Sequence, residues 1–286
     1  MRRILLLILI TVFSFNANAS HFMGGEITWE CIKKPGPDYG KFIFTMKLYQ
    51  DCNGITFPTA TQNLSIFGTT APNPTSIPLL YVGTNDISPS GVPGVEQCYD
   101  CNTQPGGTTG AIMEWIYQSD TITLTGHPPV APAPIVGWHF VWGSNARNMV
   151  VNMAAGSFSL RAIMYAYEVA PTVYLPVNPC FDSSPVFKEK AKSVICAGLP
   201  FTYSHLAFDV DLDELKYSWA DCLEAAGSYV PGNPSASAMI YTAPYTKLLP
   251  LPGNPELDSL SGEISLTPLI SGIFATCVKV ESKKCD

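Results

Sequence analysis

The sequence lacks any apolar segment beyond its N-terminus that could span a membrane. The N-terminal apolar run, 4–15, is about a dozen residues long, whereas a spanning helix needs roughly 20. Proline, glycine or polar residues interrupt every later apolar stretch. We therefore expect no transmembrane segment in the mature chain.

Clusters of basic residues are also missing. Without Arg2 and Arg3, 14 basic residues face 23 acidic ones, a net charge of −9. Proteins that hold a phosphate backbone do so with clustered Lys and Arg. Nucleic acid is therefore not an expected partner.

The motifs of common hydrolases do not occur. There is no Gly-x-Ser-x-Gly elbow and no His-Glu-x-x-His zinc motif. A glycosidase needs two placed carboxylates, and nothing separates candidates such as Glu114 and Asp120 from surface charges. We expect a protein that is not an enzyme; an extracellular hydrolase with an unrecognised site is the catalytic alternative.

The N-terminus has the pattern of a secretory signal peptide. Arg2 and Arg3 precede the apolar run, and residues 17–19 (Ala-Asn-Ala) suit signal peptidase. We predict residues 1–19 as the signal and a mature chain of 267 residues. The protein is thus expected to be secreted, at the cell surface or outside the cell.

Nine cysteines follow the signal, and an oxidising compartment makes disulfides their default state. Because nine is odd, at least one is free or pairs elsewhere. Cys98 and Cys101 form a Cys-x-x-Cys motif, but no second zinc-ligand pair is present and loop residues follow in place of a helix, so we favour a structural disulfide over zinc or redox chemistry. The nine are Cys31, Cys52, Cys98, Cys101, Cys180, Cys196, Cys222, Cys277 and Cys285.

Proline and glycine, 25 and 22 of the 286 residues, are spread along the whole chain. Proline removes a hydrogen-bond donor and clashes in helix interiors, so long helices are almost excluded. Many short strand-like runs separated by turn signals indicate a β-sandwich. In the first part these runs are 27–31, 41–49, 64–67, 111–117, 121–124, 137–142 and 158–167.

A second series of strands begins near Pro185, after a proline-containing linker at 169–184. About six strands in roughly 100 residues fit one immunoglobulin-like sandwich. We predict an all-β protein of two tandem β-sandwich domains, 20–176 and 177–286, after the signal peptide. The runs of the second series are 193–196, 200–205, 215–219, 239–242, 262–266 and 272–280.

The densest charge is the acidic run 209–214. Asp209, Asp211 and Asp213 lie two residues apart and Glu214 follows, so their carboxylates repel one another. A hard cation with oxygen ligands relieves such repulsion, and calcium suits a flexible extracellular loop. We predict calcium as the cofactor, bound by Asp209, Asp211, Asp213 and Glu214; the alternative is a solvated acidic turn before a strand.

All five tryptophans lie in strand-like runs. Core packing explains most of them, whereas an exposed pair would form a platform on which sugars stack. The five are Trp29, Trp115, Trp138, Trp142 and Trp219.

Two blocks near the mature N-terminus, 20–31 and 40–54, resemble the start of large surface proteins of Bacteroidota. These are the gliding-motility-associated or type IX secretion cargo proteins. The likeness continues at 138–148, where members often carry Cys-Cys-Arg-Asn and this chain has Asn-Ala-Arg-Asn at 145–148. The missing cysteines imply a different disulfide scheme in that part.

The second half is similar to a cadherin-like or PKD-like module. Such modules often carry Asp-x-Asp-Gly-Asp before Leu-x-Tyr, and Leu212 stands here in place of the glycine. Family members usually continue into further modules and a sorting domain. The resemblance therefore implies that this chain is a fragment, a truncated product or a short relative. Cys285 is the natural unpaired cysteine if its partner lies beyond residue 286. The similar segments are 183–187, 196–201, 209–217, 260–268 and 272–280.

The resemblance implies a secreted, non-enzymatic adhesion or structural protein of the gliding-motility-associated type. Its expected partners are other cell-surface proteins or extracellular glycans. The alternative function is a carbohydrate-binding module that acts on extracellular polysaccharide through exposed tryptophans.

Overall fold

The computed structural model describes residues 22–52, 54, 57–88, 111–189, 195–224 and 229–284. Over these residues the chain is all-β, with antiparallel sheets and no α-helix, which confirms the predicted class at that level. A 3₁₀ turn, η2 (Pro234–Ser237), lies in the second half. No helix in the described ranges is long and apolar enough to cross a membrane. The predicted signal peptide and three cysteines (Cys98, Cys101 and Cys285) fall outside these ranges.

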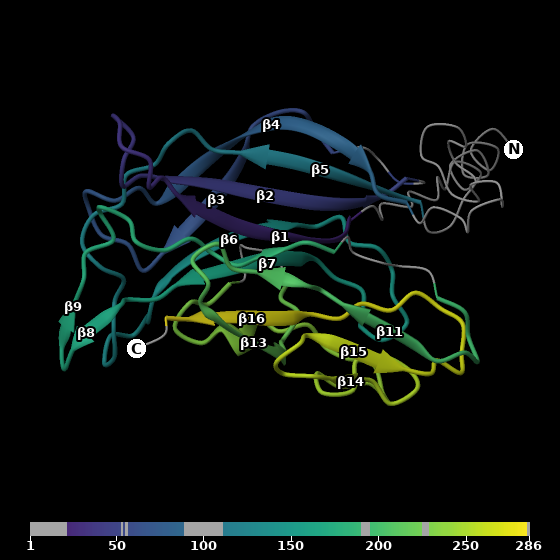
Figure 1. The fold of residues 1–286 in the computed structure, drawn as a ribbon. Helices are drawn as coiled ribbons and strands as arrows, with labels where there is room; N and C mark the ends of the chain where they lie inside the picture. The colour runs from purple at the N-terminus through teal and green to yellow at the C-terminus, as the bar shows by residue number, and fades with distance from the viewer. Residues whose placement is uncertain are drawn as a thin grey trace, which may run out of the picture.

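Seven strands of the first half form one antiparallel sheet (Figure 1). Their spatial order is β1-β2-β5-β4-β3-β6-β7. The strands are β1 (Phe22–Cys31), β2 (Phe42–Asp51), β3 (Gln62–Phe67), β4 (Ser76–Asp86), β5 (Ile112–Gln118), β6 (Trp138–Ser144) and β7 (Phe158–Met164).

Strand β2 shows why this half has a well-defined inner face. Its side chains alternate without exception between buried and half-buried, as successive residues of a strand point to opposite faces. Phe44, Met46 and Leu48 are fully buried. This alternation confirms the strand predicted over 41–49.

Strand β4 folds the sheet back on itself. Its residues 76–79 pair with β3, whereas residues 80–86 pair with β5, with a bulge between Tyr81 and Gly83. The two parts of the sheet therefore face each other, and the rings of Phe44 (β2) and Phe140 (β6) lie 4.7 Å apart. The core of the first half lies between these two layers.

Short strands make up the second half. A three-stranded sheet has the order β11-β15-β14, and β13 pairs with β16 and β10 with β12. A β8-β9 hairpin precedes them. The strands are β8 (Glu168–Ala170), β9 (Val173–Tyr174), β10 (Val186–Phe187), β11 (Phe201–Ser204), β12 (Ala207–Phe208), β13 (Glu214–Trp219), β14 (Glu256–Leu257), β15 (Glu263–Leu266) and β16 (Val278–Lys283).

The second half lies alongside the first, next to β1 and β7 (Figure 1). The backbone of Ser184 exchanges hydrogen bonds with Trp29 on β1: its N–H donates to the Trp29 carbonyl, and its hydroxyl accepts from the Trp29 N–H. Further along, Leu223 and Tyr229 pack on Val141 of β6. The two halves thus share an extended interface.

Polar side chains of the two halves also contact one another at this interface. His139 of β6 is 3% exposed; its Nδ1 faces the hydroxyl of Tyr229, and its Nε2 lies 3.0 Å from the carbonyl of Val136. Glu224 accepts hydrogen bonds from the backbone N–H and the hydroxyl of Ser157, at 2.9 and 2.5 Å. Polar groups of both halves therefore satisfy one another at buried and half-buried positions of this interface.

Disulfides hold this arrangement at two described places. Cys31, at the end of β1, is bonded to Cys180 at the start of the second half. Cys222 is bonded to Cys277 within the second half. Cys52 is also disulfide-bonded, whereas Cys196 is a free thiol and is exposed.

Candidate functional site: an acidic loop at the junction of the two halves

The acidic run forms the loop between β12 and β13. Asp209 is its buried member, 4% exposed. Its Oδ1 accepts the backbone N–H groups of Asp211 and Asp213, at 2.8 and 3.5 Å, which is the local side-chain-to-backbone bonding that makes aspartate a turn residue. Its Oδ2 is buried without a hydrogen-bond partner, and burial raises the pKa of this carboxyl.

Asp211 joins three parts of the chain. One carboxylate oxygen pairs with the ammonium of Lys33, which lies between β1 and β2, and the other accepts the N–H of Ser183 at 2.7 Å. Burial alone would raise the pKa of Asp211, but the hydrogen bonds from Lys33 and Ser183 outweigh it and lower that pKa. Asp211 is therefore held in its charged form by a lysine of the first half.

Asp213 shares a second lysine with an acid from the linker. The Lys284 ammonium lies 2.7 Å from an oxygen of Asp213 and 2.9 Å from one of Asp182. Burial raises the pKa of Asp182 to about 6, Lys284 opposes this rise, and neighbouring Asp213 adds to it. Burial opposes the charge of Lys284, but hydrogen bonds to both carboxylates raise its pKa on balance.

Glu214 does not join this group. Its side chain is 54% exposed and pairs with the equally exposed Lys216 at 3.4 Å. Glu214 is the first residue of β13, and Asp213 directly before it points inward to Lys284. The structure thus brings together three of the four predicted ligands and adds Asp182, Lys33 and Lys284.

The fit of this loop to calcium depends on its carboxylates. Calcium takes six to eight oxygen ligands at 2.3–2.6 Å. Across the described residues, no three His, Cys, Asp or Glu side chains gather as metal ligands do. A calcium ion would have to displace both ammonium groups to reach Asp211 and Asp213, so the loop as arranged here does not fit the ion.

Leu212 has a left-handed backbone conformation. Its φ is 63°, in the left-handed region that glycine enters freely and other residues enter at a cost of about 1–2 kcal/mol. Its side chain is 78% exposed. The loop therefore contains a left-handed turn residue that is not glycine, at an energetic cost.

Replacing Leu212 by Asn is expected to stabilise the protein. Asparagine tolerates the left-handed region, and little packing is lost from an exposed side chain, so we expect a gain of about 0.5–1 kcal/mol. Urea unfolding of L212N measures it, with Leu260→Asn at another exposed leucine as the control. An unchanged or lower midpoint for L212N would contradict the strain at this position.

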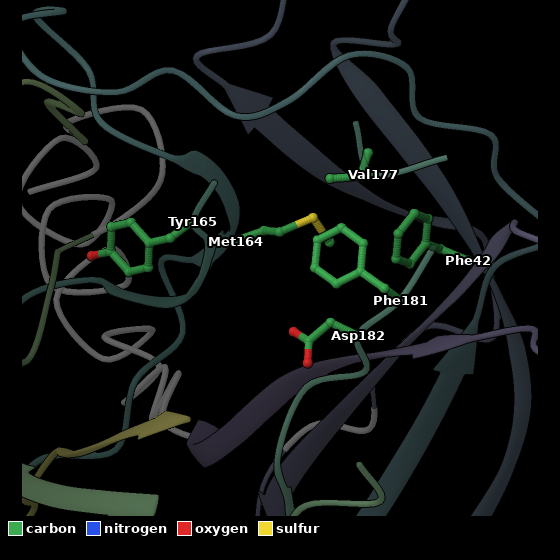
Figure 2. A pocket seen from close by; sticks show the side chains of 6 residues that line it. All are labelled: Phe42, Met164, Tyr165, Val177, Phe181 and Asp182. Atoms are coloured by element: carbon green, nitrogen blue, oxygen red, sulfur yellow. The ribbon is translucent and has the colours of Figure 1, made fainter. Parts of the chain in front are cut away.

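A small cavity adjoins Asp182. It is lined by Phe42, Met164, Tyr165, Val177, Phe181 and Asp182 (Figure 2). Its volume of about 20 Å³ is enough for about one water molecule, far below the 300–1,000 Å³ of pockets for organic ligands. Figure 2 shows the Tyr165 ring turned away from the other rings. The cavity supplies the apolar surroundings of Asp182 and is too small to hold an organic ligand.

His205 gives the second half a defined pH response. It lies against the rings of Phe187 and Tyr203, and burial lowers its pKa from 6.5 to about 4. The folded state then binds fewer protons than the unfolded state between these values. The contribution of His205 to stability is therefore complete above pH 6.5 and is lost as the pH falls through 4.

We expect His205→Gln to weaken the acid destabilisation between pH 6.5 and 4. Up to about 3 kcal/mol of the pH-dependent loss is attributable to this ring, from about 2.5 pH units. Thermal unfolding at half-unit pH steps measures the slope, with the exposed His127→Gln as the control. Parallel curves for H205Q and the parent protein would rule out this assignment.

The tryptophans expose little ring surface for the predicted sugar platform. Four of the five tryptophans are at most 7% exposed, and Trp219 is half-buried. Trp115 and Trp142 donate their indole N–H groups to Gln50 and Gln62, at 2.6 and 3.2 Å. Core packing therefore accounts for these residues.

Comparisons with known proteins identify no relative of this chain. Family models, curated proteins and solved structures each give no match to the chain.

Proposed function

We propose that this is an exported, non-enzymatic structural or adhesion protein of the cell surface, of the gliding-motility-associated type. Its two halves would be immunoglobulin-like sandwiches that act as one rigid unit. The observation that carries the proposal is the extended interface. Along it the second half is hydrogen-bonded to β1, packs on β6 and is crosslinked by Cys31–Cys180. A unit of this kind transmits force between whatever is attached to its ends.

Cysteine chemistry supports the extracellular location. Disulfides persist in oxidising compartments and are rare in the cytosol. Two described disulfides span 149 and 55 residues of the chain. A protein that depends on such crosslinks is suited to a place where no chaperone or reductant maintains it.

Carbohydrate binding ranks behind the structural function. A sugar platform requires exposed aromatic faces, and the tryptophans of the described residues pack in the core or are half-buried. We therefore propose that the protein contacts proteins and glycans of neighbouring surfaces through an adhesive face. This face would not depend on a groove lined by tryptophans.

The test is made on the producing cell. Antibodies against the mature chain are expected to label intact cells, and deletion of the chain is expected to reduce attachment to a surface under shear flow. Re-expression should restore attachment, whereas the Cys31→Ala/Cys180→Ala variant should restore it only in part because the unit is no longer stapled. Labelling only after cell lysis, or attachment that is unchanged by deletion, would refute the proposal.

A further inference from the structure

The acidic loop carries its own counter-charges, and these come from opposite sides of the junction. Lys33 belongs to the first half, between β1 and β2, and pairs with Asp211 of the second half. Lys284 follows β16 and pairs with both Asp213 and the linker residue Asp182. Two ammonium groups thus connect the first half, the linker and the second half.

Buried carboxylates distinguish these pairs from ordinary surface pairs, although the side chain of Lys33 is itself 45% exposed. The side chains of Asp211 and Asp213 are only 11% and 7% exposed. In the pair Lys216–Glu214, both side chains are about half exposed, and exposed pairs contribute little. When one partner of a buried pair is removed, the other charge is left without compensation, and the structure is strongly destabilised.

The pairs also fix the linker backbone. Asp211 uses its second oxygen to accept the N–H of Ser183, while the Ser183 hydroxyl accepts the N–H of Cys31 at 3.0 Å. Lys33, two residues after Cys31, closes this ring of contacts on Asp211. The loop, the linker and the end of β1 are therefore held in one network.

We propose that Lys33 and Lys284 are the built-in counter-cations of the acidic loop. Lys33 clamps the loop to the first half and Lys284 clamps it to Asp182 of the linker, so that the junction is rigid without calcium. The lysines pair with Asp211 and Asp213, two of the four carboxylates for which the sequence pattern predicts a metal ion. The clamp is a property of this chain's own residues and does not depend on the proposed function at the cell surface.

The test is thermal unfolding of the purified mature chain in calcium and in chelator. The midpoint of the parent protein is expected to be the same in both, because a ligand that binds only the folded state would raise it. Lys284→Met is expected to lower the midpoint by about 5 °C or more, and Lys284→Arg, which keeps the charge, to recover most of that loss. Lys216→Met is the matched control and should change nothing.

Amide exchange provides a readout that is specific to the junction. In Lys33→Met, the amides of residues 183–184 are expected to exchange faster, while those of β2, in the core of the first half, stay protected. A calcium-dependent rise in the parent midpoint would overturn the clamp. So would equal effects of Lys284→Met and Lys216→Met, or unchanged exchange at 183–184.

Discussion

Replacing Cys31 and Cys180 by alanine is expected to lower the free energy of unfolding by about 5 kcal/mol. The bond spans 149 residues, and a crosslink that closes a long loop removes much of the conformational freedom of the unfolded chain. Both cysteines are also buried, at 4% and 6% exposure. The bond ties the end of β1 to the start of the second half, so its loss should loosen the junction first.

Urea unfolding without reductant measures this loss. Cys196→Ala is the control, because that thiol is free and exposed, and it should leave the midpoint unchanged. The pair Cys222→Ala/Cys277→Ala closes a loop of 55 residues and should cost about 4 kcal/mol, slightly less than the longer loop. Equal stability of C31A/C180A and C196A would show that the bond constrains nothing in the unfolded chain.

Strands with a strong alternation could be predicted from the sequence. The run 41–49 became β2, and the runs at 64–67 and 137–142 became parts of β3 and β6. In β2 and β3 one face packs in the core, so local pattern and tertiary burial agree. In β6 the first five residues are buried on both faces. The odd cysteine count predicted that at least one cysteine is free or pairs elsewhere, and Cys196 is a free thiol. Cys285, which the resemblance named as the unpaired cysteine, lies outside the described residues.

Strand β4 could not be predicted, because its pattern carries a proline and it changes partners. Pro78 argues against a strand, but at this residue β4 is paired with β3 alone, and a strand with one free edge tolerates proline. Conversely, the runs 121–124 and 239–242 form only isolated bridges, at Ile122 and Tyr241. Their local pattern resembles a strand, but no neighbouring strand extends along them.

Only the residues of the candidate site that are close together in the sequence could be predicted. The spacing of Asp209, Asp211 and Asp213 indicated an acidic loop that needs positive charge. Lys33 and Lys284 lie 178 and 71 residues from their partners Asp211 and Asp213, so no local pattern could connect them. The tertiary structure therefore decides which cations pair with the carboxylates of the loop.

Asn152 is a buried polar residue at the interface between the two halves. It lies between β6 and β7 and is fully buried. Its side-chain N–H groups donate to the carbonyls of Pro250 and Ala275, both at 2.6 Å, and its Oδ1 accepts the Ala275 N–H at 3.0 Å. One amide side chain of the first half thus satisfies three backbone groups of the second.

Asn152→Ala is expected to lower the free energy of unfolding by about 4 kcal/mol. It removes three hydrogen bonds and leaves buried backbone groups without partners, each of which costs about 1–3 kcal/mol. Urea unfolding measures the loss, and amide exchange should show faster exchange around residue 275. Asn63→Ala, at an exposed asparagine of β3, should have little effect.

Asn152→Asp keeps the size and shape of the side chain but removes the N–H groups that donate to Pro250 and Ala275. At neutral pH its carboxylate would face two carbonyl oxygens that it cannot bond, so we expect it to be at least as destabilising as alanine. Burial beside these oxygens should raise its pKa in the folded state, so stability should be greatest below about pH 4 and fall as the pH rises. Relative to the parent protein, N152D should therefore recover at low pH while N152A does not. If the two variants behave alike at every pH, the donated hydrogen bonds are not what holds the second half at this point.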